Sequence, residues 1–114
     1  KVTYPGLKNS DGYHLATKQF EGKPGTVLSF DLESEAACFK FMNHLHLIRR
    51  ATNLNDNKSL IIHPWSTIYA EFTEEERMAM KIRKTAIRLS VGIEGAADLI
   101  EDIESALQSL HKSD

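Results

Sequence analysis

The residue in this sequence best suited to chemistry is Arg88, which lies in the segment 87–94 between apolar neighbours. Side chains of a strand alternate between its two faces, so Ile87 and Leu89 share one face while Arg88 and Ser90 share the other. A guanidinium keeps its proton, is costly to bury without an anion, and pairs best with a flat carboxylate or phosphate. Arg88 is therefore predicted either to bind a ligand carboxylate at two points or to form a structural salt bridge with one of the 16 acidic residues.

Two other patterns have the residue types of a metal site but lack the ligands that such a site needs. The loop 53–59 alternates Asn and Asp, yet an EF-hand loop starting at Asn53 would require Gly at position 58 and a carboxylate at position 64, where the sequence has Lys58 and Pro64. His44 and His46 are two residues apart at the exit of an expected helix, without a third ligand nearby. The sequence therefore favours a turn of self-bonding side chains in the loop, and no metal site.

Composition limits the class of protein. With 114 residues the chain is sized for one domain, and its net charge of −2 and pI near 6.2 argue against nucleic acid as a partner. No apolar run approaches the ~20 residues of a membrane helix. The single cysteine, Cys38, cannot form an internal disulfide and is expected to be inert core. These observations predict a soluble, cytoplasmic domain without membrane contact.

The sequence also lacks a glycine-rich phosphate loop, a paired-cysteine motif and a Gly-Xaa-Ser-Xaa-Gly elbow. Catalysis by this chain alone is therefore not expected. The chain begins at Lys1, without methionine, in a phrase typical of a protein interior, so we expect it to be a fragment of a longer protein.

The elements that must position Arg88 follow from hydrophobic periodicity. Strands are predicted at 26–32, at 59–63 and across the Arg88 segment, with an extended stretch at 47–52. A short helix is expected after the capping residues 9–12, a second after Ser34, and a third from Thr73 with Glu76 to about Lys81 as a capping box. A last helix has Glu94 and Asp98 near its positive end and one apolar stripe, formed by Leu99, Ile100, Ile103, Leu107 and Leu110.

These elements predict an α+β fold, with a small, mostly antiparallel sheet covered on one face by three or four helices. The sequence contains no internal repeat, linker or low-complexity tract.

Several phrases, in order along the chain, resemble the C-terminal domain of the pyridoxal-phosphate enzymes of cysteine and methionine metabolism, the cystathionine synthase and lyase group. The resemblance covers nearly the whole chain. The segments that carry it are 2–7, 25–30, 53–64, 74–77 and 87–94 followed by Asp98-Leu99-Ile100. Within the group, Asn53, Asp56, Lys58-Ser59-Leu60 and 61–64 look most like O-acetylhomoserine sulfhydrylases.

The resemblance implies a division of labour within a longer protein. The whole chain, 1–114, would be the C-terminal domain of a fold type I pyridoxal-phosphate transferase, inactive alone, because the lysine that holds the cofactor as a Schiff base lies in a larger N-terminal part. The resemblance implies that the enzyme is a homotetramer. Arg88 would grip the α-carboxylate of the amino-acid substrate, and Asn53 would lie beside the cofactor and that carboxylate. No catalytic residue and no covalent cofactor contact is expected in these 114 residues.

The sequence departs from the family pattern after Pro64. The family usually continues Ala-Ser-Xaa-Thr-His, whereas this chain runs Trp65-Ser66-Thr67-Ile68-Tyr69. Ser66, Thr67 and Ile68 are expected to line the site, with Ile68 where a threonine would face the substrate.

The functional expectation is a sulfhydrylase or lyase domain acting on O-acetylhomoserine or a related sulfur amino acid. The alternatives are a methionine γ-lyase domain, a cystathionine lyase or synthase domain, or a stand-alone α+β binding or oligomerisation module with Arg88 in a structural ion pair. Ile68 and Tyr69 also leave open a domain of a degenerate, non-catalytic relative.

Overall fold

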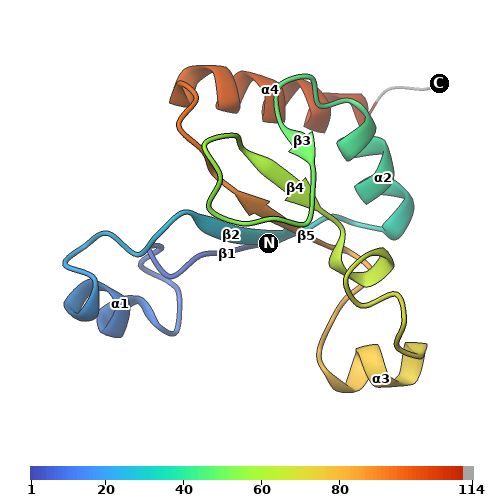
Figure 1. The fold of residues 1–114 in the computed structure, drawn as a ribbon, viewed down its shortest axis with the longest axis horizontal. Coiled ribbons are helices and arrows are strands. Elements are labelled where there is room, and N and C mark those ends of the chain that lie inside the picture. Colours follow the sequence, from blue (N-terminus) through green and yellow to red (C-terminus); the bar gives the residue numbers. More distant parts are fainter. Residues whose placement is uncertain (112–114) are drawn as a thin grey trace.

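A computed structural model describes residues 1–111 of the chain, which form one five-stranded sheet with helices on one side (Figure 1). The strands are β1 (Val2–Thr3), β2 (Val27–Asp31), β3 (Arg49–Arg50), β4 (Leu60–Ile62) and β5 (Ala86–Ser90). Their order across the sheet is β1-β2-β5-β4-β3, and only the β3–β4 pair is parallel. The predicted α+β fold with a mostly antiparallel sheet is confirmed.

Two helices cover one face of this sheet, not the three or four that were expected. Figure 1 shows α2 (Glu35–Asn43) and α4 (Ala96–Ser109) packed together over the strands. The helices α1 (Tyr13–Gln19) and α3 (Glu74–Ala79) lie beyond opposite ends of the sheet, with the 3₁₀ turn η1 (Pro64–Ser66) leading toward α3. The amphipathic pattern of a short helix does not reveal whether its apolar side meets the main sheet. None of the helices formed by residues 1–111 has the length and apolar character needed to cross a membrane.

The core lies between α2, α4 and one face of the two longest strands. Ile87 and Leu89 of β5 are 0% and 4% exposed, and they pack with Ile61 of β4 and Phe41 of α2. The ring of Phe30 on β2 meets that of Phe41 edge to face at 5.5 Å between centroids. The alternation expected for the strands is therefore confirmed, and it sends Arg88 to the face that neither helix covers.

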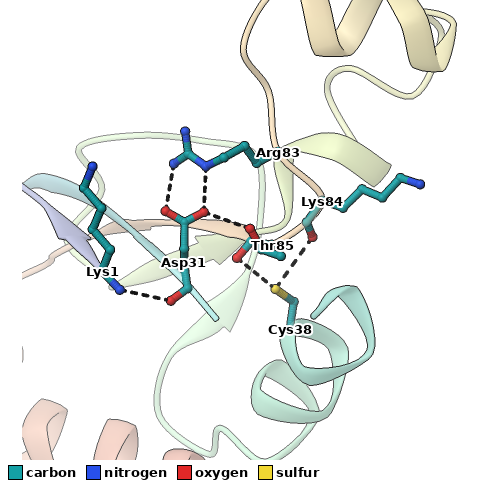
Figure 2. A network of polar contacts seen from close by, with 6 residues as sticks. All are labelled: Lys1, Asp31, Cys38, Arg83, Lys84 and Thr85. Carbon is teal, nitrogen blue, oxygen red and sulfur yellow. Dashed lines mark hydrogen bonds and ion pairs between the residues drawn. The ribbon is translucent and has the colours of Figure 1, made fainter. Parts of the chain in front are cut away.

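Cys38 is buried in this core, as the sequence predicted. Its thiol is fully inaccessible and donates to the carbonyl oxygens of Thr85, at 3.3 Å, and Lys84, at 3.8 Å (Figure 2). Burial raises the pKa of the Cys38 thiol to about 11, so the reactive thiolate is scarce at neutral pH.

The capping signals in the sequence were correct for two helices and wrong for a third. Ser34 accepts the N–H of Ala37 at 3.0 Å, and Thr73 forms the expected reciprocal capping box with Glu76, although α3 ends at Ala79, before Lys81. The N-cap of α1 is Gly12, without a side-chain cap, although capping side chains from 9–12 were expected. The only buried residue of α1 is Ala16, which leaves this helix few apolar contacts with the rest of the described chain.

Helix α3 has no buried residue and is attached to the domain by cationic side chains. The Arg77 guanidinium lies 4.3 Å from the ring centroid of Trp65, and its Nη1 donates to the Trp65 carbonyl at 2.8 Å. Lys84 lies 5.3 Å from the same ring and pairs with Glu74 at 2.9 Å. A cation over an indole ring is a favourable contact. The contact with Trp65 therefore holds α3 to the domain in place of buried apolar side chains.

The apolar stripe predicted for α4 is confirmed in part, since Ile103 and Leu110 pack against the core as predicted. Leu99 is buried as expected, whereas Ile100 is 55% exposed and Leu107 is 36% exposed. The helix turns Asp102 and Ala106 inward instead. A buried acidic residue on the inner face is not visible in a hydrophobic pattern, because its partners are backbone groups distant in the sequence.

The partners of Asp102 are three successive backbone amides between α2 and β3. Its carboxylate accepts the N–H groups of His46 at 2.8 Å, Leu47 at 3.0 Å and Ile48 at 2.9 Å. Burial alone would raise the pKa of Asp102, but the three amides outweigh it and hold the pKa below its ordinary value of 3.8. The stabilisation is therefore complete at neutral pH and is lost as the pH falls through the pKa of the folded state.

We predict that Asp102→Asn loosens the segment that precedes β3, because the amide replaces one acceptor oxygen with an NH₂ group. The expected cost is about 1–3 kcal/mol. In hydrogen exchange of the intact protein at neutral pH, the amides of 46–48 should lose most of their protection. Glu104→Gln, an exposed carboxylate on the same helix, serves as the control. Unchanged exchange in the Asp102 variant would contradict the assignment.

Candidate functional site

Arg88 lies at the centre of the sheet, with Ser29 of β2 opposite it on one side and Ile62 of β4 on the other. The side chain is half-buried. Its Nη2 donates to the carbonyl oxygen of Thr52 at 3.0 Å, while its Nε is buried without a hydrogen-bond partner. The backbone contact orients the guanidinium across β4 toward the end of β3.

Within residues 1–111 Arg88 forms no ion pair, so the salt bridge that the sequence left open is not made by the part of the chain described. An unpaired buried N–H lowers stability and is uncommon in native proteins. A flat anion that accepts from Nε and a terminal nitrogen together would remove this deficit. The geometry fits a carboxylate as the missing partner.

Asn53 follows Thr52 directly, so the contact between Arg88 and the Thr52 carbonyl brings the loop that starts at Asn53 to the arginine. The loop is also tied to β5 at Ser90, whose hydroxyl accepts the N–H of Asn55 at 3.0 Å. Asn55 has φ +56°, a left-handed conformation that Asn adopts more readily than most residues other than Gly. Lys58 N–H donates to Asp56 Oδ1 at 3.0 Å, which confirms the expected self-bonding turn.

A second attachment holds the far end of the loop. Glu94 accepts both the N–H of Ser59 at 2.9 Å and its hydroxyl at 2.8 Å, and the Ser59 oxygen accepts the N–H of Gly92 at 2.8 Å. The hydrogen bond from the Ser59 N–H lowers the pKa of Glu94, burial opposes this effect, and the Ser59 hydroxyl adds a smaller lowering. The sequence placed Glu94 near the positive end of the last helix, and in the structure it lies two residues before α4 begins at Ala96. Its bonds to Ser59 were not predicted.

The other predicted site residues are in and after η1. Ser66 and Thr67 line a cavity of about 240 Å³ whose wall also contains Thr52 and Arg50. Their hydroxyls are already bonded, Ser66 Oγ to His63 Nδ1 at 2.7 Å and Thr67 Oγ1 to the His63 carbonyl at 2.8 Å. Ile68 is 38% exposed and is not part of this cavity wall. The structure thus brings Ser66 and Thr67 to Thr52, but does not join Ile68 to them.

His63 anchors this region and is 1% exposed. Its Nε2 lies 2.6 Å from the carbonyl oxygen of Lys84, which only accepts hydrogen bonds, so Nε2 carries a proton. In the neutral ring Nδ1 then accepts from the Ser66 hydroxyl. Within residues 1–111 no group of three or more His, Cys, Asp or Glu side chains is placed to hold a metal ion.

Sequence reasoning missed Thr52, Ser59 and Ser90 as parts of the site. Ser90 shares the face of Arg88 two residues away, and that signal was available. No signal in the sequence indicated the role of Thr52, because a contact to a backbone carbonyl depends on which strands are neighbours.

Comparison with known proteins gives the geometry a context. A family model described as Cys/Met metabolism PLP-dependent enzyme matches residues 1–108. The chain belongs to this family. The resemblance inferred from the sequence is therefore confirmed, and the family depends on pyridoxal phosphate.

The relatives of this Cys/Met metabolism chain catalyse different reactions. It is 41% identical to an L-methionine gamma-lyase of Porphyromonas gingivalis, over 96% of the chain and 27% of that relative. It is 38% identical to O-acetyl-L-homoserine sulfhydrylase 1 of Thermus thermophilus, over 93% of the chain and 25% of the relative. A crystal structure of cystathionine gamma synthase from Xanthomonas oryzae pv. oryzae superposes with a TM-score of 0.90 at 39% identity, over 97% of the chain and 29% of that protein.

The chain thus spans about a quarter of the length of the curated relatives it matches. The likeness to solved structures confirms the fold type I context expected for the domain. The prediction that O-acetylhomoserine sulfhydrylases are the most similar subgroup stays a prediction, since lyases, sulfhydrylases and a synthase all match at similar identity.

We predict that Gly92→Ala displaces the loop, because a Cβ there would clash with the Asn57 carbonyl oxygen and lie 2.6 Å from the Lys58 carbonyl carbon. Overpacking of this kind costs about 1–3 kcal/mol. The intact variant should show faster hydrogen exchange at 53–59 and a lower Tm. Gly12→Ala, where no heavy atom lies within 4 Å, is the matched control. Equal stability of the two variants would show that the loop is not fixed by this close approach.

Proposed function

We propose that this chain is the C-terminal domain of a PLP-dependent enzyme acting on O-acetylhomoserine or a related sulfur amino acid, and that it binds the substrate α-carboxylate through Arg88. The observation that supports this proposal most is the half-buried Arg88 guanidinium, which has no acidic partner within residues 1–111 and has an Nε without an acceptor. An anionic ligand would supply both the missing acceptor and the missing counter-charge, whereas a neutral acceptor would supply only the hydrogen bond.

The proposal assigns the cofactor to another part of the protein. The cofactor-binding lysine belongs to a larger N-terminal domain, and the domain described here closes the substrate side of the pocket. The isolated chain is then inactive. The intact enzyme is proposed to be a cytoplasmic homotetramer, in keeping with the family resemblance.

In the proposed reaction this domain orients the substrate and supplies no reactive group. Pyridoxal phosphate supplies the electron sink when it is bound. Arg88 holds the carboxylate at two points, which fixes the direction of the bonds around the substrate α-carbon. Each charge-assisted bond of this kind contributes about 1.5–3 kcal/mol. Asn53, which is exposed and follows Thr52 in the chain, is proposed to donate a further hydrogen bond to the same ligand.

The residues that follow η1 are proposed to tune substrate choice. The hydroxyls of Ser66 and Thr67 donate their hydrogens to His63, so they can accept but not donate a hydrogen bond to a substrate. Ile68 offers an aliphatic surface where the family more often has a threonine. Such a surface favours an apolar portion of the substrate over a polar one.

We predict that Arg88→Ala in the intact enzyme raises the substrate KM or lowers kcat/KM at least about 10-fold, because at least ~1.4 kcal/mol of carboxylate binding is lost. Arg88→Lys should recover only part of this, since an ammonium lacks the planar fork. Steady-state kinetics with cofactor content checked by visible absorption would measure both. Arg49→Ala, an exposed arginine on β3, is the control. Unchanged kinetics for Arg88→Ala would remove Arg88 from the site.

A second candidate reaction is the elimination catalysed by lyases, which is favoured by the 41% identity to the Porphyromonas gingivalis methionine gamma-lyase. The two reactions differ in product. With O-acetylhomoserine and sulfide, the proposed sulfhydrylase should form a thiol amino acid and release acetate without ammonia. With methionine alone, a γ-lyase would release ammonia and a volatile thiol. We expect the first activity to exceed the second, and the reverse order would assign the chain to the lyases.

A further inference from the structure

The face of the sheet away from α2 and α4 carries an acidic residue, Asp31, that could pair with Arg88 in place of a ligand. Strand pairing places Ser29 opposite Arg88 and Asp31 opposite Ala86, so Ser29, Asp31 and Arg88 share this face. Asp31 is the only acidic residue in the five described strands. It is the diagonal neighbour of Arg88, and diagonal neighbours on adjacent strands are within reach of long side chains.

In the structure Asp31 is fully occupied by other partners. Arg83 donates from Nε to Oδ1 and from Nη2 to Oδ2, both at 2.8 Å, and the Thr85 hydroxyl donates to Oδ1 at 3.0 Å. Figure 2 shows the two carboxylate oxygens of Asp31 turned toward the parallel nitrogens of Arg83. The pair is a two-point clamp, the strongest geometry available to an arginine and a carboxylate.

Arg88 turns the opposite way, toward Thr52 on the far side of β4, and keeps its Nε without a partner. Asp31 is therefore a potential partner for both Arg83 and Arg88. In the structure it pairs only with Arg83, which precedes β5. Arg83 is 54% exposed and Asp31 only 16% exposed. The two-point geometry and the low exposure of Asp31 make this a well-defined pair, and the pair occupies the strand carboxylate that lies diagonal to Arg88.

We propose that the Asp31–Arg83 pair is a positioning device that keeps Asp31 from neutralising Arg88, and so keeps the Arg88 guanidinium free for an anionic ligand. This inference rests on the proposed role of Arg88 in carboxylate binding. Without Arg83, the freed Asp31 carboxylate attracts the guanidinium toward β2, where it competes with the ligand. Asp31 and Arg83 touch neither substrate nor cofactor in this account.

The test is a pair of single variants and their combination in the intact holoenzyme. Arg83→Ala should weaken binding of glycine, a probe with the α-carboxylate and no reactive side chain, about 5-fold in calorimetry, the factor that corresponds to ~1 kcal/mol of ion-pair competition. The KM for the amino-acid substrate should rise with little change in kcat. Asp31→Asn alone should bind glycine within about 2-fold of the parent. The double variant should recover the parent affinity, because the competitor is gone.

The pattern separates this device from a structural role. If the pair only fixes the start of β5, the double variant binds no better than Arg83→Ala, and the proposal is wrong. Glu74→Gln, which breaks the Lys84–Glu74 ion pair, is the matched control and should leave glycine binding unchanged. A crystal structure of Arg83→Ala should show the Arg88 guanidinium within 4 Å of Asp31, and an unmoved Arg88 contradicts the mechanism.

Failure of this inference is distinguishable from failure of the proposed function. If Arg88→Ala weakens glycine binding while Arg83→Ala does not, Arg88 binds the carboxylate without help from the pair. If Arg88→Ala leaves glycine binding unchanged, both proposals are contradicted.

Discussion

The two faces of β5 are the constraint on which the rest of the structure depends. Ile87 and Leu89 are almost completely buried against α2 and α4, while Arg88 and Ser90 face away from both helices. A slip of one residue in the pairing with β2 or β4 would put the guanidinium into the apolar core, at a large cost in free energy. The hydrophobic effect therefore fixes the direction of the candidate binding group, even though it acts on the other side of the strand.

Polar side chains complete what the short strands cannot. The strands β3 and β4 have two and three residues, so few ladder hydrogen bonds hold the loop between them. Glu94 and Asp102 supply the missing acceptors for backbone amides, and Ser90 anchors the loop to the strand that carries Arg88. Both carboxylates have a lowered pKa, so they stabilise this arrangement at neutral pH and lose that effect in acid. The loop that starts at Asn53 is thereby held to a rigid sheet.

Relatives with one fold and several reactions suggest which parts of the domain are general and which are specific. All amino-acid substrates carry an α-carboxylate, so a group such as Arg88 serves a lyase, a sulfhydrylase and a synthase equally well. Choice among those reactions requires contacts to the remainder of the substrate. Ile68 is the feature of this chain most relevant to that choice, because it puts an aliphatic side chain where the family pattern has a polar residue.

The sequence by itself determined the local features: the alternation in β5, the caps at Ser34 and Thr73, and the family to which the chain belongs. Each depends on residues close together in the chain, where side-chain type and spacing dictate conformation. Only the tertiary structure decided that Asp102 turns inward and that Thr52 orients Arg88, with Asp31 bound by Arg83 instead. These contacts join segments more than 30 residues apart, so they depend on which strands and helices become neighbours, which hydrophobic periodicity does not encode.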